Sequence, residues 1–116
     1  MALDWTQGAL AEGLICYDRA EFFEAHEHWE SVWLRADGVE KTLLHGVIQV
    51  AIALCHHQRG NRKGAMALFA KAQKNLMRCP ESFEGIAVAR LREEVAAWSR
   101  ALMMNEEAMP PIPVVR

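Results

Sequence analysis

Apolar residues recur along the chain at intervals of three and four positions, and no long run alternates between apolar and polar residues from residue 5 to residue 104. This spacing gathers apolar side chains on one face of an α-helix. Most of the residues that carry the pattern (Ala, Leu, Met, Glu, Lys and Arg) also have high helix propensity. The sequence therefore predicts an all-α fold, a single compact bundle of about five helices.

Helix boundaries are predicted from residues that start or stop a helix. Asp4 and Asn61 are expected to cap the first and fourth helices, and Gly38 is expected to end the second in a left-handed conformation. The predicted helices are residues 4–17, 20–35, 39–59, 62–77 and 86–104. We assign residues 1–108 to one α-helical domain and residues 109–116, which are rich in proline, to an extended tail.

The predicted helix 39–59 is apolar on nearly every face, which predicts that protein surrounds it. It is therefore expected to be the central helix, and its polar residues His45, Gln49 and His56 stand out. Its apolar run, residues 43–55, is shorter than the roughly 20 residues of a membrane span. We expect a core helix and no membrane association.

The most unusual stretch is residues 26–33, His-Glu-His-Trp-Glu-Ser-Val-Trp. His26, Glu30 and Trp33 follow the spacing i, i+4, i+7, so one helical stripe carries an imidazole, a carboxylate and a large aromatic ring. Burying such polar groups costs free energy unless they are paired. This stripe is therefore the predicted functional site.

A second set of polar residues is expected to face this stripe. The loop between the second and third helices is short, so the two helices should form an antiparallel hairpin. Residues at the same height in this hairpin have numbers that sum to about 75. His26 is then level with Gln49, and Glu30 is level with His45.

Two interpretations of this cluster are open. In the structural one, Glu30 pairs with His45 and Gln49 pairs with His26, which forms a closed hydrogen-bond network that fixes the helix register. In the functional one, His26, Glu30 and His45 are ligands of a divalent metal, Zn²⁺ or Fe²⁺, with positions left for water or substrate. Gln49 would then orient a ligand or bound water, and Trp33 would wall the site. Metal-bound water is the usual basis of metal-assisted hydrolysis.

Charge is segregated along the chain although the net charge is only −2. Residues 1–40 hold nine acids and two bases, whereas residues 41–80 hold seven bases and no acid. Either the basic helix 62–77 lies beside acidic neighbours, or it presents a surface that binds anions. No overall positive field and no nucleic-acid-binding module are present, so nucleic acid is not an expected partner.

The three cysteines Cys16, Cys55 and Cys79 are odd in number and widely spaced, unlike a disulfide framework or a zinc knuckle. The N-terminus lacks a basic segment followed by a long apolar stretch, as a signal peptide would have. We therefore expect a reduced, cytoplasmic protein.

The chain resembles a family of small all-α proteins from bacteria and archaea that is catalogued as domain of unknown function 309. The resemblance covers roughly residues 10–78 and is carried by residues 22–33, 44–51 and 56–65. The family motif His-x-x-x-Glu-x-x-Trp matches His26, Glu30 and Trp33, and Gly-x-Ile-Gln matches residues 46–49. The resemblance implies a suggested role in metal binding and no defined activity.

Two functions from different classes follow. The first is a protein with a divalent-metal or small-ligand site between the second and third helices, which includes a metal-dependent hydrolase whose catalytic residues the sequence does not identify. The second is a non-catalytic binding or assembly protein, such as a homodimer, in which the His, Glu and Gln cluster is a structural network.

Overall fold

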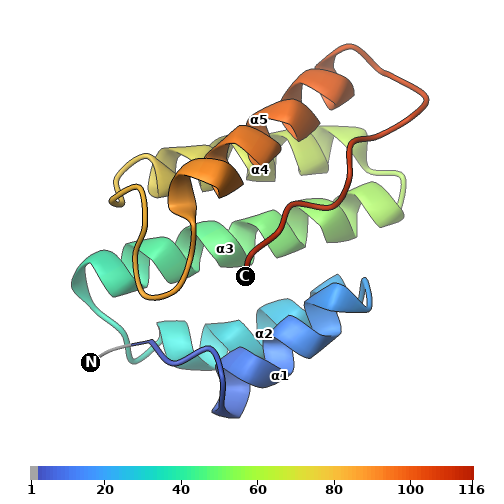
Figure 1. Ribbon diagram of the computed structural model, residues 1–116. Coiled ribbons are helices and arrows are strands. Elements are labelled where there is room, and N and C mark those ends of the chain that lie inside the picture. Colours follow the sequence, from blue (N-terminus) through green and yellow to red (C-terminus); the bar gives the residue numbers. More distant parts are fainter. Residues whose placement is uncertain (1–2) are drawn as a thin grey trace.

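The computed structural model describes residues 3–116 and confirms the all-α fold (Figure 1). The described chain forms the helices α1 (Gly8–Asp18), α2 (Phe22–Trp33), α3 (Gly38–Gln58), α4 (Arg62–Leu76) and α5 (Val88–Met103). Helix α3 packs between α2 and α4, while α1 packs on α2 and α5 packs on α4. The order of the helices in space therefore follows the chain, with α3 in the middle.

Helices α1, α2 and α5 begin later than predicted. Asp4 does not cap α1, because its carboxylate accepts the backbone N–H of Thr6 at 2.9 Å and the side-chain amide of Gln7 at 2.6 Å. These bonds hold a turn, and the helix begins at Gly8. The start of α2 is delayed because Ala20 has a left-handed backbone, with φ of 61°.

The other boundaries follow local turn chemistry. Asn61 caps α4 as predicted, since its side-chain oxygen accepts the backbone N–H of Gly64 at 2.9 Å. Gly38 has the predicted positive φ of 58°, but it begins α3 and does not end α2. The predicted start of α5 is wrong, because Phe83 and Ile86 pair in an isolated antiparallel bridge before the helix.

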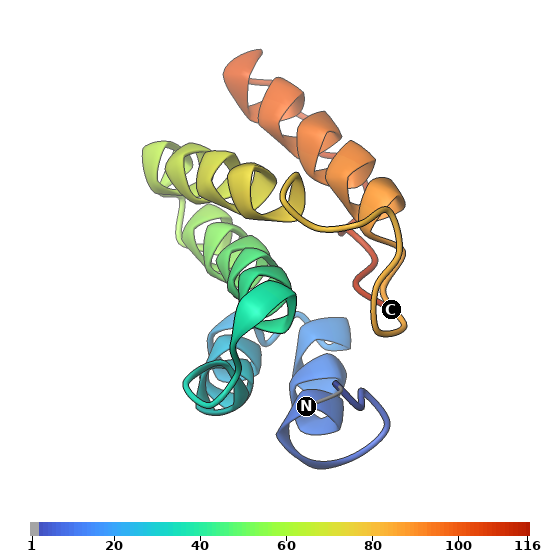
Figure 2. The same ribbon diagram turned by 90° about the vertical axis from the view of Figure 1, so that its left-hand side faces the viewer.

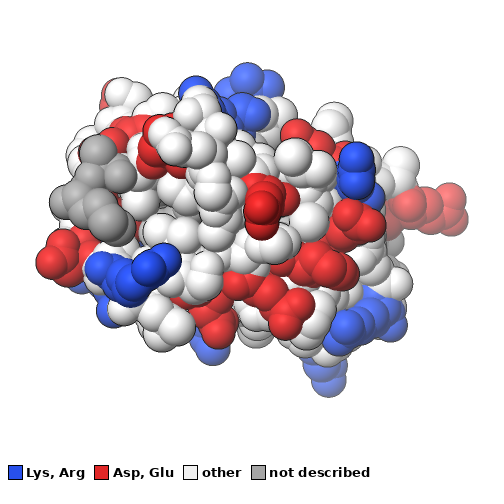
Figure 3. Space-filling view, turned by 90° about the horizontal axis from the view of Figure 1, so that it is seen from below, with Lys and Arg blue, Asp and Glu red and all other residues white. Residues whose placement is uncertain are grey.

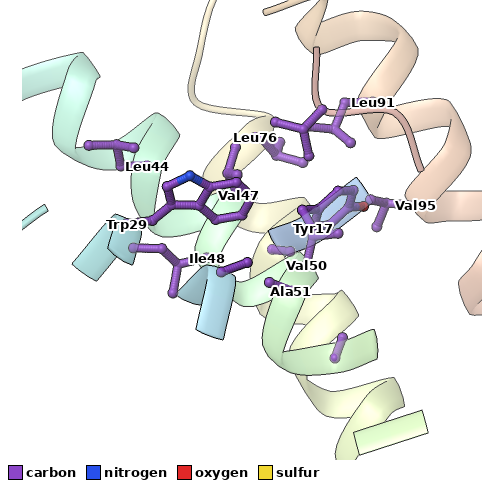
Figure 4. Packing of buried hydrophobic residues seen from close by; sticks show 14 of the residues in the cluster. Tyr17, Trp29, Leu44, Val47, Ile48, Val50, Ala51, Leu76, Leu91 and Val95 are labelled. Carbon is purple, nitrogen blue, oxygen red and sulfur yellow. The ribbon is translucent and has the colours of Figure 1, made fainter. Parts of the chain in front are cut away.

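One hydrophobic cluster extends through all five helices. Its largest buried side chains include Trp29 of α2, which has no exposed surface, and Trp98 of α5. Figure 4 shows the packing around Trp29, with Val47 of α3 and Leu76 of α4 also in the cluster. Nearly all of the middle of α3 is buried, so the sequence correctly identifies it as the core helix.

The C-terminal residues 109–116 are extended and lie across the bundle between α1 and α5 (Figure 2). The hydroxyl of Tyr17 in α1 donates to the carbonyl of Pro113 at 2.6 Å. The indole N–H of Trp98 in α5 donates to the carbonyl of Pro111 at 2.8 Å, and Val115 is buried. The tail therefore connects the two outer helices.

Within the described residues, α3 is the one helix whose length and composition would allow it to cross a membrane. In this structure 56% of its most apolar window is buried inside the protein. The packing of α2 and α4 against it explains its apolar character, as in the core helix of a soluble globule.

Acidic side chains are frequent on the face formed by α1 and α2, where basic side chains also lie (Figure 3). Figure 3 views the molecule from the side of α1 and α2 and shows carboxylates over much of this face. The ion pairs among the described residues are His26–Glu30, His28–Glu12 and Arg90–Glu94. None of the three includes a base of α4, so the described residues give these bases no close ion pair.

Candidate functional site: a groove between α2, α3 and α4

Helix α2 buries one stripe of side chains, formed by Phe22, Ala25 and Trp29. The indole of Trp29 fits because Gly13 of α1 lies against it: a Cβ atom built at Gly13 would be 2.2 Å from the indole nitrogen. That nitrogen donates to the backbone carbonyl of Leu10 at 3.2 Å. Trp29, which is outside the predicted motif stripe, therefore holds the core position of α2.

The motif stripe lies beside the buried stripe, at the edge of the core. The side chain of His26 is 18% exposed, that of Glu30 is 52% exposed, and Trp33 is partly buried. The expectation that these residues form a buried polar layer is wrong for Glu30. The stripe instead borders solvent, where a ligand can reach it.

His26 is held by its own helix. Its Nδ1 lies 2.8 Å from the carbonyl of Phe23, and because a carbonyl only accepts, Nδ1 carries the proton. Its Nε2 lies 3.5 Å from a carboxylate oxygen of Glu30. The imidazole therefore presents Nε2 next to the carboxylate of Glu30. With a lone pair, Nε2 can bind a metal; with a proton, it can form an ion pair with Glu30.

Gln49 joins α3 to α4 and not to α2. Its side-chain oxygen accepts the amide of Asn75 at 2.7 Å, so its amino group faces Nε2 of His45 at 3.3 Å. With this orientation Nε2 of His45 accepts, which in a neutral imidazole puts the proton on Nδ1. The side chains form a directed chain from Asn75 through Gln49 to His45.

Gly46 explains how α4 comes close enough for this bond. A Cβ atom at Gly46 would lie 3.0 Å from Leu76 and 3.4 Å from Asn75, so the absence of a side chain permits a close helix approach. Gln49 follows one helical turn later and reaches the same segment of α4. The residues of the Gly-x-Ile-Gln match thus set the register of α3 against α4.

Trp33 forms a wall of the site. Its ring centroid lies 5.3 Å from that of His45, and the ammonium of Lys41 lies 4.6 Å from the ring centroid in a cation–π contact. The indole N–H is buried without a hydrogen-bond partner. An unpaired buried donor costs roughly 1–3 kcal/mol, so Trp33 is held there for its ring and not for its N–H.

These side chains surround a depression of about 210 Å³, which we call the central groove. It is lined by Glu30, Trp33, His45, Ile48, Gln49, Ile52, Leu68 and Lys71. The groove brings together four of the five predicted site residues from two helices. The fifth, His26, lines a neighbouring pocket of about 140 Å³ with Phe23, Cys55 and His56, and Ile52 borders both spaces.

The predicted pairings therefore differ from those observed. The described residues show no hydrogen bond between Glu30 and His45 or between His26 and Gln49, since Glu30 pairs with His26 and Gln49 with Asn75 and His45. The sequence did predict that Glu30 and His45 share one space. It missed Asn75 and Lys71, because matching residues at the same height considered only the hairpin of α2 and α3. Gly46 was the signal that α4 also comes close.

The three proposed metal ligands do not converge. Among residues 3–116 no group of three His, Cys, Asp or Glu side chains is placed to hold one metal ion. Nε2 of His45 is occupied by Gln49, which leaves His26 and Glu30 as the adjacent donors. The predicted three-residue metal site thus does not fit this arrangement, and only a two-residue part of it is formed.

Comparisons with known proteins agree with the sequence resemblance. The family model described as Domain of unknown function (DUF309) matches residues 10–68, which contain every predicted site residue and exclude Lys71 and Asn75. An uncharacterized protein of Aquifex aeolicus (strain VF5) is 31% identical over 103 residues, or 88% of this chain. The match takes in 30% of that relative, so the chain spans about a third of its length.

Proposed function

The chain belongs to the family described as Domain of unknown function (DUF309), which defines no activity, and we propose that it binds a small molecule in the central groove. The observation that carries this proposal is the convergence of Glu30, Trp33 and His45 from α2 and α3 on one open space. Concave sites with a few polar groups on an apolar lining are where proteins bind ligands.

The lining defines the chemistry of the ligand. Ile48, Ile52 and Leu68 provide an apolar floor, and Trp33 provides an aromatic wall. Glu30 accepts hydrogen bonds, and His45 offers the N–H of Nδ1 because Gln49 occupies Nε2. A compact ligand with an apolar or aromatic part and one polar group fits this set.

The size of the groove adds a constraint. Its volume of about 210 Å³ is smaller than the ~300–1,000 Å³ of sites for drug-sized ligands. The ligand is therefore either very small or extends beyond the groove.

Binding of benzamide, which has an aromatic ring and an amide that donates and accepts, tests the proposal. We expect a titration followed by ¹H–¹⁵N NMR to shift the signals of the lining residues, including the indole N–H of Trp33. Trp33→Leu and Glu30→Gln should each weaken binding at least about tenfold, or ~1.4 kcal/mol. Glu27→Gln, an exposed carboxylate on the same helix, is the matched control and should bind like the wild type. Shifts that are absent, or that are equal in all variants, contradict the proposal.

A divalent metal at His26 and Glu30 is the second candidate function, and the geometry of His26 favours it. A histidine that binds metal usually donates its other ring N–H to a carbonyl or carboxylate, as Nδ1 of His26 does to Phe23. With only two protein donors in place, a bound ligand or water would have to complete the coordination. A metal-dependent hydrolase remains the enzyme class that such a site would serve.

Elemental analysis of protein purified without chelator tests this second function. We expect stoichiometric zinc or iron in the wild type and its loss in His26→Ala. His28→Ala, which removes a more exposed histidine of the same helix, is the control and should keep the metal. Circular dichroism should show both variants folded. A wild type that binds no metal after reconstitution with Zn²⁺ and Fe²⁺ rules the site out.

We also infer that the protein acts in a reducing compartment such as the cytoplasm. Its cysteines Cys16, Cys55 and Cys79 are all free thiols. Burial raises the pKa of the thiols of Cys16 and Cys79, which keeps them protonated and unreactive. Such thiols persist where disulfides are rare. The homodimer stays a prediction of the sequence.

A further inference from the structure

A second depression adjoins the central groove at the C-terminal end of α4. It has a volume of about 510 Å³ and is lined by Gln49, Lys71, Lys74, Asn75, Met77 and Arg78. We call it the basic hollow, because three of its six lining residues are cations and none is an acid.

The two spaces form one continuous surface. Gln49 and Lys71 line both of them, so a ligand in the central groove can extend past these residues into the basic hollow. Gln49 is 7% exposed and is fixed by Asn75, whose amide donates to the Gln49 oxygen. On the shared wall, Gln49 is therefore held in place and its acceptor oxygen is already occupied.

Among residues 3–116, the cations of the hollow form no ion pair with a carboxylate. The ion pairs among the described residues leave out Lys71, Lys74 and Arg78, and no Asp or Glu lines the hollow, although Glu30 lines the adjoining central groove with Lys71. Basic residues at the end of a helix do complement its dipole. The interaction with the helix dipole explains why basic residues lie near the C-terminal end of α4. It does not explain why their side chains surround a hollow that continues from the central groove.

We propose that the basic hollow binds the phosphate group of the ligand, so that the ligand of this protein is a phosphate monoester with an apolar or aromatic part. This inference rests on the proposed function, because the central groove holds that second part. A phosphate monoester carries nearly two negative charges and three acceptor oxygens. The hollow offers two ammonium groups, a guanidinium and the side-chain amides of Gln49 and Asn75. This set of donors suits a phosphate group better than a ligand with a single carboxylate.

Three probes separate the two spaces: benzyl alcohol, inorganic phosphate and benzyl phosphate. We expect NMR titration of the wild type to give a dissociation constant for benzyl phosphate at least tenfold below that of either other probe.

The triple variant Lys71→Gln, Lys74→Gln, Arg78→Gln should lose this gain in affinity for benzyl phosphate while still binding benzyl alcohol. The control variant Arg35→Gln, Lys63→Gln, Arg100→Gln removes three bases outside the hollow, so it has the same net charge, and it should keep the gain. Raising the salt concentration should weaken only the phosphate-dependent part.

The outcomes distinguish the inference from the proposed function. If benzyl alcohol and benzyl phosphate bind equally, the inference fails and the proposed function stands. If inorganic phosphate binds as tightly as benzyl phosphate and Trp33→Leu has no effect, the central groove holds nothing and the proposed function fails. Equal losses in the two triple variants indicate nonspecific attraction and overturn the inference. An oligothymidylate that binds more tightly than benzyl phosphate and is insensitive to Trp33→Leu also overturns it, in favour of nucleic acid.

Discussion

Replacing Gly13 by alanine is expected to destabilise the protein by about 2 kcal/mol or more, although alanine is the better helix former by ~1 kcal/mol. The new methyl group would lie 2.2 Å from Nε1 and 2.5 Å from Cδ1 of Trp29. This indole has no exposed surface and packs edge-on to Trp5 at 5.9 Å, so it has little freedom to move. For a chain of this size the loss corresponds to a fall of about 8 °C in the melting temperature, measured by calorimetry.

Gly46→Ala is the matched control, since Gly46 is also buried within a helix. Its nearest contacts would be 3.0 Å from Cδ2 and 3.1 Å from Cγ of Leu76, so a shift of a few tenths of an ångström between α3 and α4 would relieve them. We expect a loss clearly smaller than that of Gly13→Ala. In a Trp29→Leu background, Gly13→Ala should cost much less, because the two substitutions share one contact. A Gly13→Ala protein as stable as the wild type would show that the indole can move.

Removing the tail after Met109 is expected to lower the free energy of unfolding by about 3 kcal/mol, less than its contacts alone suggest because the tail regains conformational entropy. The deletion removes the buried Val115 and the carbonyls that accept from Tyr17 and Trp98. Urea unfolding followed by circular dichroism measures the change.

Two valine substitutions separate this effect from a general effect of the tail. Val115 is 3% exposed and Val114 is 41% exposed, so Val115→Ala should cost about 2 kcal/mol and Val114→Ala only a few tenths. Equal effects at the two positions would mean that the tail is not packed in solution as it is here.

Tyr17 provides a spectroscopic readout for the same contact, because it is the one tyrosine in the sequence. Burial, followed by the nearby carboxylates Glu94 and Asp18, raises the pKa of its hydroxyl above the ordinary value of about 10. The folded protein therefore keeps Tyr17 neutral, and its contribution to stability is complete below about pH 10 and is lost as pH rises towards the raised pKa. Tyrosinate absorbance should appear at lower pH in the truncated protein than in the intact one.

The fold could be predicted from the sequence because its signals are local. The three-and-four spacing of apolar residues indicated all five helices, and Asn61 capped α4 as expected. The predicted helix starts failed where a residue could either begin a helix or hydrogen-bond within a turn. Asp4 bonds to Thr6 in a turn, and Ile86 pairs with Phe83 before α5 begins.

The candidate site was predicted in part. Glu30, Trp33, His45 and Gln49 do border one space, because helical spacing and a short loop together limit how two helices can face each other. His26 was expected to face Gln49 but lines a neighbouring pocket, and Glu30 was expected to be buried although it is half exposed. The spacing placed Trp29 on the core side, but it could not show that the indole fits there through the room left by Gly13 on another helix.

The sequence by itself determined the elements, the central place of α3 and, apart from Lys71, the polar residues that border the central groove. These properties depend on periodicity and side-chain chemistry within one helix or one hairpin. Only the tertiary structure decided that Gln49 bonds to Asn75, that the three supposed metal ligands are divided between two pockets, and that the bases of α4 continue the groove. The physical reason is that α4 approaches α3 at Gly46, and the register of α4 depends on packing between residues far apart in the chain.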